Sequence, residues 1–69
     1  MNDHDIYSDF IVVVQQIGRL FMSLREYSDA LRAFQASLRL CGTHHVSWFN
    51  SGICLHHLAR YDEALDAFR

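Results

Sequence analysis

Apolar side chains near the start of the chain recur at helical spacing. Between Ile6 and Leu24 they are spaced alternately four and three residues apart, which places them on one side of an α-helix. The stripe consists of Ile6, Phe10, Val13, Ile17, Leu20 and Leu24, and Val14 and Phe21 widen it. This pattern predicts an amphipathic helix of about five turns.

A turn and a second helix follow. Residues 24–28 hold the predicted turn, and we expect Ser28 or a neighbour to cap the second helix. Apolar residues at helical spacing then run from Ala30 to Cys41. Gly42 fits a left-handed helix stop, and Thr43 fits the cap of the next helix.

The remainder of the chain predicts two more helices. The third runs from about His44 to Ala59, and the fourth starts near Asp62 and reaches Arg69 after about two turns. The sequence contains no proline, which suits a chain that is nearly all helix. We therefore expect an all-α fold with three full helices and a truncated fourth.

The aromatic, glycine and alanine positions of the first half recur 34 residues later. So many matched pairs at one offset indicate an internal repeat rather than shared composition. The pairs are Val14/Trp48, Gly18/Gly52, Phe21/Leu55, Leu24/Leu58, Tyr27/Tyr61, Ala30/Ala64, Leu31/Leu65, Ala33/Ala67 and Phe34/Phe68.

The period and the residue types resemble the tetratricopeptide repeat (TPR), a helix-turn-helix unit that stacks into an α-solenoid. The resemblance divides the chain into an N-terminal extension (1–10), a first repeat (11–43) and a second repeat (44–69) truncated in its second helix. The chain thus resembles an α-solenoid fragment of about one and three-quarter repeats. It departs from the family at five positions: Arg25 and Ala59 stand where the turn often has glycine, Ser51 where leucine is usual, Ser37 where alanine is usual, and Gly42 where proline is usual.

The repeat also predicts how its helices pack. Gly18 and Gly52 lie inside helices, where glycine is unfavourable unless a neighbouring helix needs the space. In the family, the position of Trp48 packs the two helices of a repeat together, so we expect Trp48 in the core. Tyr27 and Tyr61, at the turns, are likewise expected to be packing residues.

Composition and charge exclude several classes of function. Hydrophobic residues form 51% of the chain and charged residues 20%, a balance typical of a globular protein. The net charge of −2 gives no basic surface for a nucleic-acid backbone, so no nucleic-acid partner is expected. The longest apolar run, residues 10–14, is far shorter than the roughly 20 residues that span a bilayer. With two cysteines and no dense disulfide framework, we expect a cytoplasmic protein without membrane insertion.

Two groups of cysteine and histidine suggest metal or nucleophile chemistry at first sight. Cys41 is followed by His44 and His45, and Cys54 by His56 and His57. On one helix His45 and Cys54 would be about 13 Å apart, too far to share a zinc ion. Burial of Cys54 within a helix would raise its thiol pKa and oppose a Cys54/His57 nucleophile pair. We therefore expect no enzyme activity, no catalytic residue, no cofactor and no metal.

The TPR resemblance implies a binding surface formed by the first helix of each repeat. Carried over by register, this candidate groove consists of Val12, Gln15, Arg19, Met22, Val46, Phe49, Asn50, Ile53, His56 and His57. The row is apolar with a few cationic or titratable side chains, which suits an apolar segment with an acidic or polar end. An equally open alternative is that Val46, Phe49 and Ile53 pack on an adjoining repeat or on a second copy of the chain. Some family members clamp acidic tails, but Gln15 and Arg19 replace the lysine and asparagine of that clamp, so we do not expect it. Asp62, Glu63 and Asp66 are interpreted as a solvated helix face.

Two functions remain open from the sequence. The first is a non-catalytic protein-protein interaction module, a scaffold or adaptor that presents the groove to a peptide or to a partner helix. The alternative is a self-association unit, because stacked repeats generally need about three units for a continuous core. In that case the exposed repeat ends would drive homo-oligomerisation.

Overall fold

The computed structural model describes residues 3–40 and 45–69, with side chains from Asp9 onward. It contains four helices in this part of the chain: α1 (Asp3–Ser23), α2 (Tyr27–Leu40), α3 (His45–His57) and α4 (Tyr61–Phe68). No described residue belongs to a strand. The all-α prediction is therefore confirmed for the described residues.

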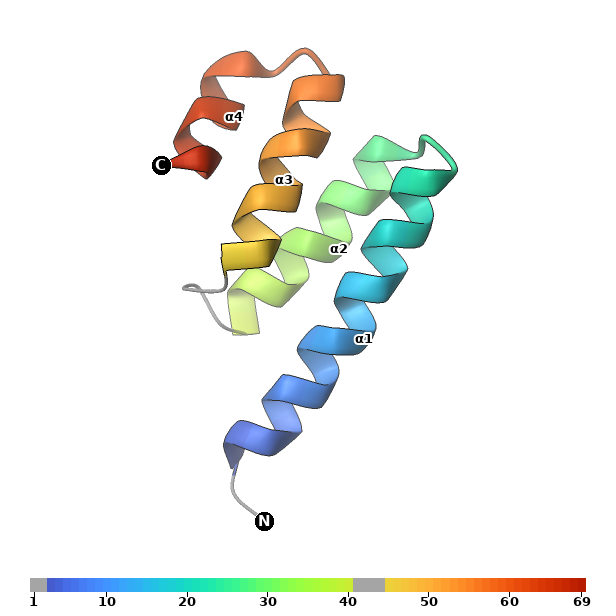
Figure 1. Ribbon diagram of the computed structural model, residues 1–69, viewed down its shortest axis with the longest axis vertical. Coiled ribbons are helices and arrows are strands. Elements are labelled where there is room, and N and C mark those ends of the chain that lie inside the picture. The colour runs from blue at the N-terminus through green and yellow to red at the C-terminus, as the bar shows by residue number, and fades with distance from the viewer. Residues whose placement is uncertain (1–2, 41–44) are drawn as a thin grey trace.

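The helices form a single layer in which each helix packs on the next one along the chain (Figure 1). Helices α1 and α2 form one antiparallel hairpin, and α3 and α4 form a second hairpin beside α2 (Figure 1). The molecule measures 42 × 26 × 13 Å, and its shortest dimension is close to the diameter of one helix. Among the described residues, no helix therefore lies over either broad face of the layer.

The helix boundaries follow the predicted pattern with small shifts. Of the predicted caps, Ser28 or a neighbour, Ser28 is ruled out because α2 begins at Tyr27 and Ser28 lies inside the helix. The first helical hydrogen bond runs instead from the Ala30 N–H to the Glu26 carbonyl. The predicted stop at Gly42 and cap at Thr43 lie outside the described residues.

The two turns have the same backbone geometry although neither contains glycine. Arg25 and Ala59 both adopt the left-handed conformation, with φ of 60° and 61°. In the first turn the Glu26 N–H donates to the Phe21 carbonyl at 2.8 Å, and in the second the Arg60 N–H donates to the Leu55 carbonyl at 2.9 Å. This is the Schellman arrangement, in which a left-handed residue allows the chain to leave the helix.

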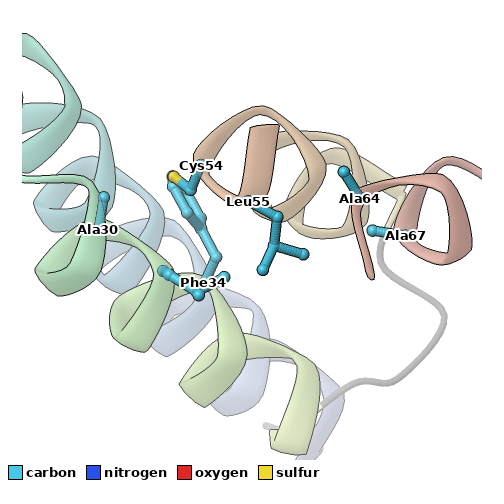
Figure 2. Close-up of a cluster of buried hydrophobic side chains, with 7 residues drawn as sticks. Ala30, Phe34, Cys54, Leu55, Ala64 and Ala67 are labelled. Carbon is cyan, nitrogen blue, oxygen red and sulfur yellow. The ribbon is translucent and has the colours of Figure 1, made fainter. Parts of the chain in front are cut away.

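A small core lies between α2, α3 and α4 (Figure 2). Phe34, fully buried, reaches from α2 towards Cys54 on α3, and Ala64 and Ala67 approach from α4 (Figure 2). Four small side chains in this cluster allow the helix backbones to come close together. The buried cluster consists of Ala30, Leu31, Phe34, Cys54, Leu55, Ala64 and Ala67.

The structure explains both helix-interior glycines. A Cβ added at Gly18 would lie 2.6 Å from the Cζ atom of Phe34, and a Cβ added at Gly52 would collide with the ring of Phe68. Each hairpin therefore places an aromatic ring of its second helix directly on a glycine of its first. The prediction that these glycines make room for a neighbouring helix is confirmed.

Two aromatic packing predictions need correction. Trp48 is 41% exposed, so its assignment to the core is wrong. Helix α4 has 8 residues against 14 in α2, and its last residues border a hollow beside Trp48 instead of enclosing the indole. Tyr27 is half-buried as expected, but Tyr61 is 57% exposed because α4 has no following helix against its outer side in the structure.

Candidate functional site

The residues of the predicted groove lie on α1 and α3, the first helices of the two hairpins. Gln15 on α1 donates from Nε2 to the Ser47 hydroxyl on α3 at 3.3 Å. Ser47 also contacts the Ser37 hydroxyl of α2, which lies 2.8 Å from the Phe34 carbonyl. This buried chain of polar contacts ties α1, α2 and α3 together beneath the predicted surface.

The predicted groove residues differ in how far they reach solvent. Val12, Val46 and Phe49 are exposed by 48%, 51% and 58%. Arg19, His56 and His57 are also exposed, whereas Gln15, Met22, Asn50 and Ile53 are half-buried. Met22 packs against the core cluster, so its contribution is partly structural.

Val12 and Val46 occupy equivalent positions, 34 residues apart, and both remain exposed. The hairpin of Val46 has another hairpin packed beside it, on α2, yet Val46 is as exposed as Val12. Contact between hairpins therefore leaves this position uncovered. An apolar side chain at such a position is available to a ligand in both hairpins.

Phe49 extends this apolar surface towards α4. Its ring centroid lies 5.7 Å from that of Phe68, with the ring planes inclined by 55°. Such a tilted pair is a favourable aromatic geometry and holds the Phe49 ring in place. Phe49 therefore presents a fixed, solvent-facing aromatic surface.

The two histidines at the end of α3 belong to an aromatic cluster that the sequence did not predict. The His57 ring stacks on Tyr27 of α2, with centroids 4.1 Å apart and planes 5° from parallel. The His56 ring meets Tyr61 at 5.4 Å in an edge-on arrangement. The His57 ring is thus directed to the α1–α2 turn, and it links the two hairpins.

Two hollows flank Trp48, and sequence reasoning missed both because it placed Trp48 in the core. The first, of about 540 Å³, is lined by His45, Trp48, Phe49, Asp66, Ala67, Phe68 and Arg69. The second, of about 470 Å³, lies between α2, α3 and α4 and is lined by Leu31, Gln35, Leu38, Arg39, Trp48, Ser51, Leu55, Glu63, Asp66 and Ala67. Ser51 lines the second hollow where the family usually has leucine, and that smaller side chain leaves space.

A third hollow lies on α1, away from Trp48. It has a volume of about 330 Å³ and is lined by Gln16, Arg19, Leu20 and Ser23. Among the predicted groove residues, Phe49 lines the first hollow and Arg19 lines this third one.

The buried thiol of Cys54 is poorly suited to nucleophilic chemistry. Cys54 is fully buried, and burial raises its pKa to about 11 because the thiolate would lose its hydration. The prediction that Cys54 is a small core residue is confirmed. Cys41 and His44 lie outside the described residues, and within the described part no three His, Cys, Asp or Glu side chains are grouped as metal ligands.

The acidic residues of α4 face solvent, as predicted. Asp62, Glu63 and Asp66 are exposed. Arg60 donates from Nε and Nη2 to the two carboxylate oxygens of Glu63 at 2.6 and 2.7 Å. These hydrogen bonds lower the pKa of Glu63 below its ordinary value. The pair secures the first turn of α4 at the surface.

No helix in the described part of the chain combines the length and the apolar character needed to cross a bilayer. Comparison with known protein families, with curated proteins and with solved structures found no match. The TPR resemblance accordingly stays a prediction from the sequence pattern. What the structure establishes is an all-helical arrangement of two similar hairpins.

Proposed function

We propose that this chain is a non-catalytic protein-protein interaction module of the TPR type. In this proposal its two hairpins are successive repeats of an α-solenoid, and the surface of α1 and α3 receives a peptide or a partner helix. The observation that carries the proposal is the exposure of Val12 and Val46, which persists in both hairpins.

Three repeated features support the assignment of the hairpins as solenoid repeats. Both turns pass through a left-handed residue, and both hairpins place a phenylalanine ring on a helix glycine. Each helix also packs on the next one in the chain, as in repeat proteins whose units contact only their neighbours.

The chemistry of the surface indicates the class of ligand. Val12, Val46 and Phe49 supply exposed apolar area, and Arg19 supplies an exposed positive charge. The ten predicted groove residues include no acidic side chain. We therefore propose an apolar segment with an acidic or polar end, bound as a helix or an extended peptide.

Peptides selected from a random library against the chain provide the test. Aromatic anchors commonly dominate binding, so Phe49→Ala is expected to weaken binding of the selected peptides about tenfold or more. Leu65→Ala is the matched control, because Leu65 is also 58% exposed but lies on the outer side of α4. Fluorescence anisotropy of labelled peptides gives the affinities, and circular dichroism checks that helicity is retained.

Two results would contradict this function. One is selected peptides that bind the Phe49→Ala variant as tightly as the parent chain. The other is loss of helicity in that variant, which would make Phe49 a structural residue.

A further inference from the structure

One side of α1 carries an apolar face that no other described helix covers. Val13, Ile17, Leu20 and Leu24 are exposed by 57%, 44%, 65% and 70%. They are spaced four, three and four residues apart, so Val13, Ile17 and Leu20 form one stripe along α1 that Leu24, the residue directly after the helix, continues. We call these four residues the α1 face.

The equivalent residues 34 positions later are covered by a neighbouring helix. The counterparts of Val13, Ile17 and Leu20 are Ser47, Ser51 and Cys54, with exposures of 0%, 3% and 0%. Leu58, the counterpart of Leu24, packs against the core. These residues lie where α3 meets α2, as the contacts of Ser47 with Ser37 and of Cys54 with Phe34 show (Figure 2). The α1 face is therefore a second copy of the side of α3 that binds α2.

The exposed apolar side chains of α4 correspond to the other half of this interface, which is the side of α2 that meets α3. Tyr61, Leu65 and Phe68 are exposed by 57%, 58% and 48%, and we call them the α4 face. Their counterparts on α2 contact α3 or are buried: Tyr27 stacks on His57, Leu31 is 5% exposed and Phe34 is fully buried. The α4 face is therefore a second copy of the side of α2 that binds α3.

We propose that two copies of this chain assemble head to tail, with the α4 face of one copy packed on the α1 face of the next. The contact repeats the part of the α2–α3 interface that Tyr27, Leu31 and Phe34 form, because α4 carries the counterparts of these three residues. Ser37, which contacts Ser47, has no counterpart in α4. Such a contact is heterologous and leaves a free face at each end, so the assembly grows with concentration.

The sizes of the side chains refine the geometry of this contact. Val13, Ile17 and Leu20 are larger than Ser47, Ser51 and Cys54, so α4 lies farther from α1 of the next copy than α2 lies from α3. Distances between packed helix axes vary over about 8–10 Å with the side chains at the contact. In this arrangement Leu20 of the next copy takes the place of Cys54, against the ring of Phe68.

The test uses two variants that each remove one face, mixed together. Leu20→Glu places a charge on the α1 face, and Leu65→Glu places one on the α4 face; both side chains are more than half exposed, so each variant keeps its fold. In sedimentation equilibrium the parent chain is expected to gain mass with concentration, while each variant alone stays monomeric. Mixing the two variants restores association as a one-to-one complex, because each supplies the face that the other lacks.

A matched control and a second pair of variants complete the design. Val12→Glu charges an exposed apolar position of α1 outside the α1 face, so it is expected to leave assembly unchanged. Leu24→Glu and Tyr61→Glu repeat the test at other positions on the two faces. The Val12→Glu variant also separates this proposal from the peptide-binding function, since it disturbs the groove alone.

Three outcomes would overturn head-to-tail assembly. The first is a parent chain that stays monomeric at every concentration, because the α1 and α4 faces would then need a different protein as their partner. The second is association that persists in either single variant, since it would mean that like faces pair. The third is a mixture of the two folded variants that stays monomeric.

Discussion

At the scale of single residues, Arg25 and Ala59 hold backbone conformations that glycine adopts more easily. Each has φ near +60°, where a Cβ atom crowds the following carbonyl. The TPR pattern that the sequence resembles often has glycine at these positions, and glycine adopts this conformation without the strain of a Cβ atom. The chain keeps both turns because the hydrogen bonds of the Schellman arrangement hold them.

Replacing Ala59 by glycine is expected to raise the free energy of unfolding by about 1 kcal/mol. Removing the left-handed strain contributes roughly 1–2 kcal/mol, and the greater freedom of glycine in the unfolded chain offsets part of it. Urea denaturation followed by circular dichroism measures the difference. Ala36→Gly, in the middle of α2, is the control and should lower stability by up to about 1 kcal/mol. A loss of stability in Ala59→Gly would contradict the turn geometry.

The buried Cys54 thiol makes stability depend on alkaline pH. Its pKa rises from an ordinary value of 9.0 to about 11 in the folded chain, so the unfolded state loses this proton first. The contribution of this protonated thiol to the free energy of unfolding is therefore full below about pH 9 and falls as the pH rises towards 11. Urea midpoints measured across this range are expected to fall more steeply for the parent chain than for Cys54→Ala. Parallel pH profiles would show that the thiol is not buried.

At the scale of the helices, the length of α4 decides the environment of Trp48. Helix α4 ends at Phe68, whose ring lies against Phe49, and the Trp48 indole borders two hollows instead of filling a core. The aromatic ring of Phe34, by contrast, is enclosed on all sides. Phe34 is therefore a core residue, whereas Trp48 is partly exposed to solvent.

Trp48 is the only tryptophan, so its fluorescence reports this environment directly. Acrylamide is expected to quench the emission readily in the folded chain, and Trp48→Ala should cost clearly less stability than Phe34→Ala. The latter removes a fully buried ring and should cost about 3–5 kcal/mol, enough to unfold so small a domain. Blue-shifted emission that resists quenching would place Trp48 in a core after all.

The features that the sequence predicted are those set by neighbours within one repeat. The stripe from Phe10 to Leu24 predicted α1, and the glycines at 18 and 52 predicted close helix contacts, because both patterns are local. The stacking of His57 on Tyr27 was not predictable, since it joins residues 30 positions apart through the angle between two hairpins. The exposure of Trp48 was missed because the prediction assumed a second helix of the length usual in the TPR pattern, whereas α4 is shorter. The positions of the candidate groove were predicted from the repeat. Their equivalence to family positions did not show that Met22 packs on the core or that His57 stacks on Tyr27 of α2.

At the scale of the whole molecule, the internal repeat separates two kinds of exposed apolar residue. Val12 and its counterpart Val46 are both exposed, whereas Ile17 and Leu20 are exposed and their counterparts, Ser51 and Cys54, are buried. The first kind belongs to a surface that stacking leaves open, and the second to a surface that stacking covers. Comparing equivalent positions in the two hairpins therefore distinguishes these two kinds of exposed residue within one chain.

The sequential packing of α1 on α2, α2 on α3 and α3 on α4 also bears on how the chain reaches this structure. Contacts between successive helices close only short loops, so the loss of chain entropy before each contact forms is small. Proteins with such local contacts fold in roughly microseconds to milliseconds. Because the core cluster draws on α2, α3 and α4, the first hairpin gains this burial only when the second is present, so the described helices are expected to fold as one cooperative unit.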